Sequence, residues 1–232
     1  MKWSSFFTSS IGKKFVMGLT GLFLITFLVV HVGINSCIWA NDHGLMFNKA
    51  AHFMGSSVLI RLMEIGLFAG LLLHTYQGYL LTVQNQRTRS VGYAVSMGNK
   101  GSKWYSRSMG LLGTLLLLFL ILHISHFWIP SRINQDQLTP VSVPYGGEIH
   151  NLYAKMFEVF QGNLLIVVIY VLGCISLAYH LAHGFQSAFR TIGLYNTKYL
   201  SLVSTVGLGF SIIVPLAFAA MPIGIYLGWI EI

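Results

Sequence analysis

The chain has 232 residues, of which 55% are hydrophobic and only 9% are charged. A water-soluble domain usually has about 25% charged residues, so this composition excludes a soluble globular protein and indicates an integral membrane protein. The formal net charge is +8, but nothing in the sequence suggests that the partner is nucleic acid.

Five apolar stretches are long enough to cross a bilayer as helices, which takes about 20 residues each. They cover approximately residues 15–38, 58–83, 108–129, 161–188 and 202–229. The apolar runs are continuous and do not alternate with polar residues, which favours helices over a membrane β-barrel. The sequence therefore predicts an all-α fold, an integral membrane five-helix bundle, as a single membrane domain over residues 1–232.

The segments around these stretches carry further signals. The first stretch is too long for a signal peptide and no small-residue cleavage site follows it, so we expect a retained span. After it, the sequence DHGLMFNKAAHFM (42–54) is compatible with a helix lying on the outer surface. The 130–160 loop has three prolines and a Gly-Gly pair, which predicts irregular chain in part of it. Pro215 and Pro222 would bend the fifth span.

Basic residues are concentrated in three segments that contain no Asp or Glu: the N-terminus, the 84–107 loop and the 189–201 loop. These segments hold ten of the fourteen basic residues: Lys2, Lys13, Lys14, Arg87, Arg89, Lys100, Lys103, Arg107, Arg190 and Lys198. Because basic loops remain cytoplasmic, we expect the N-terminus in the cytoplasm and the C-terminus outside. This basic face could bind anionic membrane lipid or an acidic partner in the cytoplasm.

Six of the nine histidines fall in four of the five spans: His31, His74, His123, His126, His180 and His183. A histidine inside a span is costly and usually marks function. At about 1.5 Å of rise per residue, His31 and His123 lie about 25 Å from the inner edge, and His74 and His180 lie about 20 and 15 Å from it. This predicts two facing pairs at two depths.

Short sequence patterns repeat in the same pairing. In GLFLITFLVVH (21–31) and GTLLLLFLILH (113–123), a glycine precedes the histidine by ten residues. HTYQG (74–78) and HLAHG (180–184) share H-x-x-x-G, which places a glycine one turn beyond the histidine on the same helix face. Gly78 and Gly184 would leave clearance for a flat ring, and this match selects His180 rather than His183.

Paired histidines on facing helices suit the axial ligands of non-covalent b-type haem. The two cysteines form no C-x-x-C pair, which excludes covalent c-type haem. We therefore expect two haem b groups, whose iron ligands are His74 with His180 and His31 with His123. Two haems at two depths would form an electron path across the bilayer. The alternative for any one of these histidines is that a neighbouring helix satisfies it structurally.

Other residues have two open interpretations each. His126 and His183, three residues beyond the proposed ligands, could bond a haem propionate or a quinone carbonyl, or could be interface histidines. Glu64, with Arg61 one turn away, could accept protons from a quinol or form an outer-edge ion pair. Candidates for propionate contacts at the inner face, or simple membrane anchors there, are Lys14, Trp104, Arg107 and Arg190.

These motifs resemble a known family. TGLFL (20–24) with His31, FNKAA (47–51), LLLH-x-x-x-G (71–78) and YH-x-x-x-G (179–184) are similar, in order and spacing, to the single-chain dihaem cytochrome b anchor of succinate:menaquinone reductases and fumarate reductases. The resemblance covers nearly the whole chain.

The resemblance implies a respiratory electron-transport function linked to the tricarboxylic acid cycle. His74 and His180 would bind the inner, proximal haem, and His31 and His123 the outer, distal one. The basic face would hold an iron–sulfur subunit and, through it, a flavoprotein subunit that oxidises succinate or reduces fumarate. Menaquinone would bind beside the bundle, in a bacterial inner membrane, and a higher oligomer of the whole complex is compatible with this arrangement.

One position departs from the family pattern. Some fumarate reductases carry a glutamate, tied to proton movement, two residues before the ligand of the fourth helix, where this chain has Ala178. We therefore expect no proton route of that kind. Two alternative classes stay open: a cytochrome b subunit of another quinone-linked dehydrogenase or hydrogenase, and a non-redox membrane transporter with intramembrane histidines.

Overall fold

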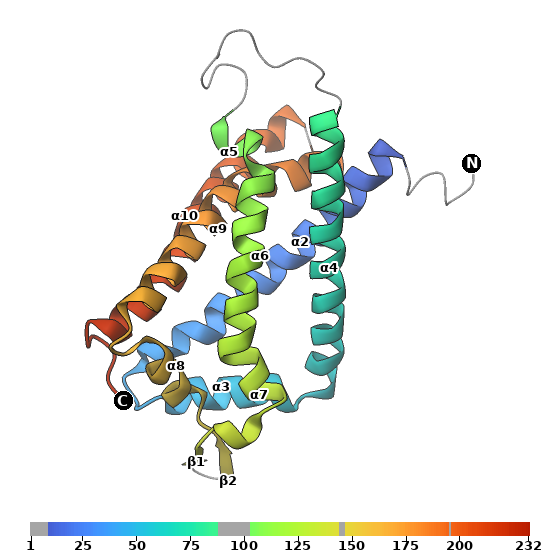
Figure 1. The fold of residues 1–232 in the computed structure, drawn as a ribbon. Coiled ribbons are helices and arrows are strands. Elements are labelled where there is room, and N and C mark those ends of the chain that lie inside the picture. Colours follow the sequence, from blue (N-terminus) through green and yellow to red (C-terminus); the bar gives the residue numbers. More distant parts are fainter. Residues whose placement is uncertain (1–8, 88–102, 144–146, 195) are drawn as a thin grey trace. The chain divides into compact units, whose positions relative to one another are not determined.

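The structure, a computed structural model, describes residues 9–87, 103–143, 147–194 and 196–232. Five helical segments are long and apolar enough to cross a membrane: Ser10–Ala40, Val58–Arg87, Met109–Arg132, Leu164–Thr191 and Lys198–Tyr226 (Figure 1). The expectation of five apolar spans is confirmed. The fourth span begins at Leu164 rather than near residue 161, because a separate helix ends at Phe160.

The spans are built from eight helical elements. The first contains α2 (Ser10–Ser36) and a 3₁₀ turn, η1 (Cys37–Ala40), and the second is α4 (Val58–Arg87). A short helix, α5 (Trp104–Arg107), precedes the third span. That span contains α6 (Met109–His123), a π-helical turn, η2 (Ile124–Trp128), and α7 (Ile129–Arg132). The fourth and fifth are α9 (Leu164–Thr191) and α10 (Thr197–Tyr226). The helix α10 runs through both of its prolines, so their presence does not end it.

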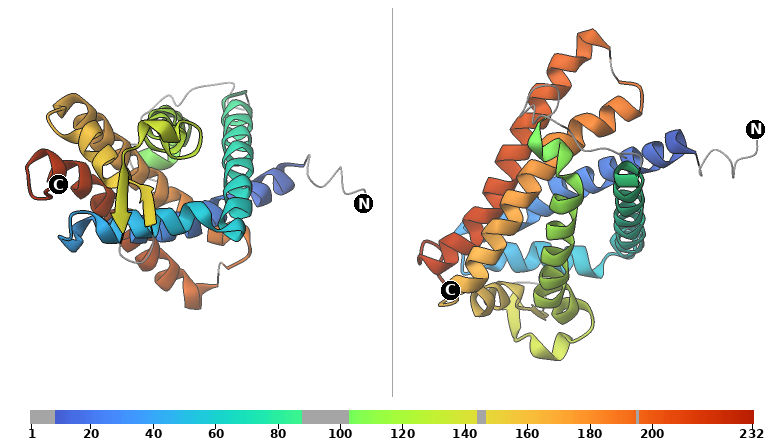
Figure 2. Two further views of the ribbon diagram at one scale, coloured as in Figure 1. Left: turned by 90° about the horizontal axis from the view of Figure 1, so that it is seen from below. Right: turned by 45° about the horizontal axis from the view of Figure 1, so that its top comes forward.

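Smaller elements lie between the spans. The predicted helix in the 42–54 segment is confirmed as α3 (Leu45–Ser56). The 130–160 segment contains η3 (Gln135–Gln137), strands β1 (Pro140–Val143) and β2 (Gly147–His150), and α8 (Leu152–Phe160). The strands pair antiparallel, with Pro140 opposite His150, and lie beside α3 (Figure 2). The all-α prediction is therefore wrong for this hairpin, where a proline at the first strand position costs no ladder bond.

The chain divides into two compact units. The first unit comprises Met1–Phe27, Leu67–Leu116 and Ser176–Ile212. The second comprises Leu28–Gly66, Leu117–Ile175 and Ile213–Ile232. Every spanning segment contributes residues to both units. The expectation of one membrane domain stays a prediction.

The two units differ in charge. The first contains no Asp or Glu in its sequence, and its described basic residues are Lys13, Lys14, Arg87, Lys103, Arg107, Arg190 and Lys198. Lys2, Arg89 and Lys100 lie outside the described residues. All six acidic residues belong to the second unit: Asp42, Glu64, Asp136, Glu148, Glu158 and Glu231.

Small residues allow close helix packing in the first unit, as is usual in membrane helices. A Cβ added at Gly18 would lie 3.2 Å from the Thr191 side chain, and one at Gly110 would lie 2.8 Å from Thr82. The buried hydroxyl of Ser176, in α9, donates to the backbone oxygen of Leu112, in α6, at 3.1 Å. These contacts bring α2 to α9, and α6 to both α4 and α9.

The second unit has an apolar core that joins the spans to α3 and α8. Its buried members are Ile38, Phe47, Tyr153, Met156, Phe157, Phe160, Val167, Tyr170, Met221, Ile225 and Ile230. A buried amide, Asn48 of α3, connects this core to the start of α8. Its oxygen accepts from the Tyr153 backbone N–H at 3.0 Å, and its nitrogen donates to Asn151 Oδ1 at 2.9 Å.

The Tyr153 hydroxyl donates a hydrogen bond to the backbone oxygen of Glu231. Burial raises the pKa of this hydroxyl, and the charges of Asp42 and Glu231 raise the pKa further. The tyrosine therefore keeps its proton at neutral pH and remains a donor, which attaches the last residues of the chain to α8.

Candidate functional site

In the first unit, α4 and α9 bring His74 and His180 together. The ring centres lie 6.2 Å apart with 62° between the ring planes. Thr20 of α2 also contacts His74, with its Oγ1 3.1 Å from His74 Nδ1. The Nδ1 atom of His180 is buried and has no hydrogen-bond partner among the described residues.

Two glycines face these rings. A Cβ added at Gly21 would lie 3.5 Å from His74 Cε1, and one added at Gly113 would lie 3.9 Å from His180 Cε1. These are the glycines that precede His31 and His123 by ten residues. Each G-x₉-H pattern therefore places its glycine beside a ring of the first unit and its histidine in the second unit.

The two H-x-x-x-G glycines have different neighbours. A Cβ at Gly184 would lie 4.0 Å from Cδ2 of its own His180, an ordinary contact. A Cβ at Gly78 would lie 3.1 Å from the terminal methyl group of Met17, a flexible side chain. Their assignment as ring clearance stays a prediction. His183 is half-buried, one turn from His180.

In the second unit, α2 and α6 bring His31 and His123 together. Their ring centres lie 5.8 Å apart, with 88° between the planes. Aromatic rings surround the pair within 5.4–6.1 Å: Phe218 beside His31, and Phe119, Phe127 and Tyr170 beside His123. The amide nitrogen of Asn35 lies 3.3 Å from His31 Nδ1. The buried Nδ1 atom of His123, like that of His180, has no partner within the described part of the chain.

Both pairs fit the dimensions of an axial bis-histidine site. An imidazole nitrogen lies about 2 Å from a bound metal, and the ring centre about 1 Å further, so two rings on opposite sides of one metal have centres about 6 Å apart. The observed separations of 6.2 and 5.8 Å agree with this value. Aromatic pairs also pack at such distances, so the separation alone does not define a metal site.

The number of side chains in each pair limits the kind of metal group that the pair could hold. Across the described ranges, no group of three or more His, Cys, Asp or Glu side chains could hold a metal ion. Each histidine pair offers two ligands, which matches a metal whose other positions a macrocycle fills. A buried polar atom normally has a partner, so the unpartnered Nδ1 atoms of His123 and His180 are compatible with a ligand-binding role.

His126 lies in the π-helical turn η2, and the structure gives it a partner. Its Nδ1 is 3.0 Å from the Tyr170 hydroxyl, and the two rings stack with an angle of 3° between them. Tyr170 itself is buried among Phe119, Phe127 and Phe160. Sequence reasoning did not identify Tyr170, because it carries no motif and contacts His126 only through the tertiary fold.

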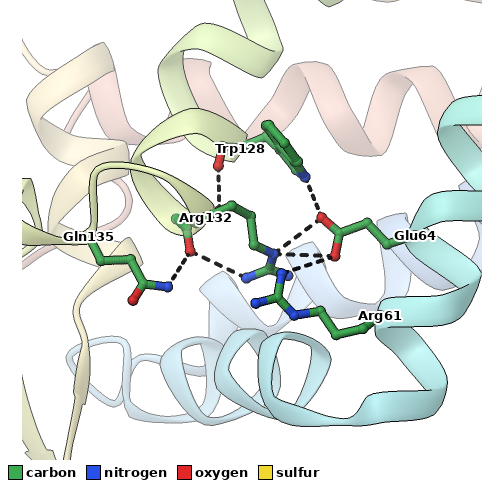
Figure 3. Close-up of polar contacts among 6 residues, drawn as sticks. Arg61, Glu64, Trp128, Arg132 and Gln135 are labelled. Carbon is green, nitrogen blue, oxygen red and sulfur yellow. Dashed lines mark hydrogen bonds and ion pairs between the residues drawn. The ribbon is translucent and has the colours of Figure 1, made fainter.

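Glu64 lies at the centre of a polar cluster in the second unit (Figure 3). It pairs with Arg132 Nε at 3.2 Å, and it accepts a hydrogen bond from Trp128 Nε1. Arg61, the expected partner, lies further away, at 3.7 Å, and its side chain is 50% exposed against 18% for Arg132. The geometry is that of an ion pair; a role with a quinol stays a prediction. Arg132 and Trp128 were not identified from the sequence.

The four candidates for propionate contacts belong to the first unit: Lys14, Trp104, Arg107 and Arg190. Lys14, Arg107 and Arg190 are exposed. Trp104 packs its ring 5.0 Å from that of Tyr179, the residue before His180. No contact of Trp104 with the His74–His180 pair is found among the described residues, so its role with a propionate stays a prediction.

These features are those of a multi-pass helical membrane protein with two histidine pairs among its helices. No protein-family model, curated protein or solved structure shows significant similarity to the chain. The function is therefore argued from the site itself.

Proposed function

We propose that the chain is the membrane anchor subunit of a succinate dehydrogenase or fumarate reductase, a cytochrome b with two b-type haems. It would pass electrons between a cytoplasmic iron–sulfur subunit and menaquinone in a bacterial inner membrane. One observation carries the proposal: four histidines from four spanning segments form two pairs, with ring centres 6.2 and 5.8 Å apart. The family resemblance described above supports the choice of enzyme.

The roles of the residues follow from the pairs. His74 and His180 would hold one haem iron, and His31 and His123 the other. Bound haem supplies an iron that gains and loses one electron. The protein's part is to fix the axial ligands and to exclude water. Around the second pair the rings of Phe119, Phe127, Tyr170 and Phe218 provide an apolar surrounding of this kind.

The charge distribution supports a cytoplasmic partner. The charged side chains of the first unit are all basic, and acidic residues occur only in the second unit. Basic segments beside membrane spans remain cytoplasmic and attract acidic surfaces. The iron–sulfur subunit, with a flavoprotein subunit attached to it, would bind to this basic surface, and succinate or fumarate chemistry would take place in those partners.

The decisive experiment measures haem per chain. The full chain, purified from haem-replete membranes in mild detergent, should contain two b-type haems by the pyridine haemochrome assay. His74→Ala or His180→Ala should each remove one haem, and His31→Ala or His123→Ala should each remove the other. His183→Ala is the matched control, three residues from His180, and should retain both. A wild-type chain without haem would contradict the proposal and revive the transporter alternative.

A second experiment identifies the enzyme. A tagged chain, isolated from its native membrane, should bring with it an iron–sulfur subunit and a subunit with covalent flavin, and the complex should reduce a menaquinone analogue with succinate. Recovery of a hydrogenase or a formate dehydrogenase in their place would assign the chain to another quinone-linked complex.

A further inference from the structure

Thr20 has an unusual position among the threonines of the spans. Several of them donate their hydroxyl proton to the backbone oxygen four residues earlier: Thr20, Thr26, Thr82, Thr114 and Thr191. Of these, Thr20 is the one whose Oγ1 also contacts a histidine ring within the described residues, at 3.1 Å from His74 Nδ1. The contact joins α2 to α4.

The hydrogen atoms at this contact can be assigned by counting. A threonine hydroxyl has one proton to donate and two lone pairs that accept. The proton of Thr20 goes to a backbone oxygen of α2, that of Val16 at 2.8 Å or that of Met17 at 3.2 Å. Its oxygen can then only accept from His74, so the Nδ1 atom of His74 carries the ring proton. A neutral imidazole has one N–H, which leaves the Nε2 atom with an unshared lone pair.

We propose that Thr20 is a positioning residue that fixes the tautomer of His74, so that Nε2 is the nitrogen available to a metal. The inference rests on the proposed haem function and specifies how one of its four ligands is prepared. Histidine ligands of metals commonly donate their second ring N–H to an acceptor that fixes the tautomer and makes the ring a stronger ligand. The side-chain oxygen of Thr20 is such an acceptor, and it is held in place by its own bond to α2. The backbone oxygen of Met17, also in α2, is a second hydrogen-bond partner of His74.

A different side chain contacts His31 in the second unit. The Asn35 amide nitrogen donates to the His31 backbone oxygen at 2.8 Å and lies 3.3 Å from His31 Nδ1. Thr20 belongs to the first unit and contacts His74, so the effect of changing Thr20 should be confined to the His74–His180 pair.

The test uses three variants of the full chain. Thr20→Val keeps the shape of the side chain and removes the hydroxyl. Thr20→Ser restores the hydroxyl. Thr26→Val is the matched control, because Thr26 lies on the same helix, makes the same backbone bond at 3.0 Å and is exposed.

The first measurement does not depend on haem. Nitrogen-15 solid-state NMR of the histidine-labelled chain in bilayers, with the His74 signal assigned through His74→Gln, should show the Nδ1–H tautomer in the wild type, in Thr20→Ser and in Thr26→Val. Thr20→Val should shift His74 toward the Nε2–H form. An Nε2–H tautomer in the wild type, or no change in Thr20→Val, would overturn the inference.

The second measurement follows haem binding and redox potential. Thr20→Val should lower the affinity for one of the two haems by about 10-fold to 100-fold. It should also raise the midpoint potential of that haem, because a ring without the bond donates less electron density to the iron. Thr20→Ser should restore both values. If the wild type binds two haems and Thr20→Val has the same haem affinity and midpoint potential as Thr26→Val, the tautomer inference is wrong and the haem function stands. If the wild type shows the expected tautomer but binds no haem, the haem function is refuted instead.

Discussion

Gly21 and Gly113 show how a missing side chain can matter beside a ligand-binding ring. Their α-carbons face His74 and His180, and an added Cβ would lie 3.5 and 3.9 Å from those rings. An alanine would therefore make an ordinary contact, whereas any longer side chain would enter the space of the imidazole. The restriction is on volume, not on backbone conformation, since neither glycine has a left-handed φ angle.

Replacing Gly21 with a large residue should remove one haem. Gly21→Leu would push atoms into the position of the His74 ring and displace it from His180, so we expect one haem per chain in place of two, by the pyridine haemochrome assay. Gly21→Ala should retain both. Gly33→Leu, on the same helix with nothing within 4 Å of the added Cβ, is the control and should also retain both. Two haems in Gly21→Leu would show that the space beside His74 is not needed.

At this scale the sequence predicted which histidines lie close together but not what holds them. The proximity of His74 and His180 followed from depth and from a repeated spacing. The bond from Thr20 to His74 joins residues 54 positions apart in the chain, and nothing local to either residue indicates it. The positions of Gly21 and Gly113 could not be predicted for the same reason. The sequence pattern relates each glycine to a histidine on its own helix, whereas the histidine ring that each one faces belongs to a different helix.

The third span is not a regular helix, and the irregularity lies next to a proposed ligand. The π-helical turn Ile124–Trp128 directly follows His123, and the backbone N–H of Ile129 donates to Ile124, five residues earlier. Such turns are rare and often occur at functional sites. Within the turn, His126 contacts Tyr170, and Trp128 bonds to Glu64. The turn sequence ISHFW itself contains no Pro or Gly that would mark an irregular helix. The two contacts could not be expected either, because their partners lie 44 and 64 residues away in the chain.

The connection between α3 and α8 depends on one buried amide, and its loss should destabilise the second unit. Asn48 is 1% exposed and bonds to both Tyr153 and Asn151. Asn48→Ala would leave the Tyr153 N–H buried without an acceptor, which costs about 1–3 kcal/mol. We expect that decrease in the free energy of unfolding, measured in mixed detergent micelles of increasing dodecyl sulfate content.

The neighbouring lysine provides the control for this change. Lys49 is exposed on the same helix, and Lys49→Ala should alter the free energy of unfolding by no more than about 0.5 kcal/mol. Equal stability of Asn48→Ala and Lys49→Ala would mean that the amide network does not hold α3 to α8. The helix α3 itself was foreseen from its composition, but its attachment was not, because Asn48 and Tyr153 are 105 residues apart.

Across the whole molecule, the division into two units coincides with the division of charge. The first unit is purely basic, while the second contains every acidic residue. Each unit also contains one histidine pair. Charge asymmetry is visible in a sequence because it depends only on composition along the chain. The division of the spans into units is not, because it depends on which parts of each helix contact one another.

The charge division predicts the orientation of the chain in the membrane. If all five apolar helices cross the membrane, the start of the first span and the end of the fifth lie on opposite sides of it. The basic segments should then lie in the cytoplasm. Single cysteines at two exposed positions, Asn85→Cys in the last turn of α4 and Ser142→Cys in β1, can report this in a Cys37→Ser, Cys174→Ser background. On intact cells stripped of their outer membrane, an impermeant maleimide should label Ser142→Cys and leave Asn85→Cys unlabelled until the cells are lysed. The reverse pattern would place the basic surface outside, out of reach of a cytoplasmic iron–sulfur subunit, and would refute the proposed partner along with the orientation.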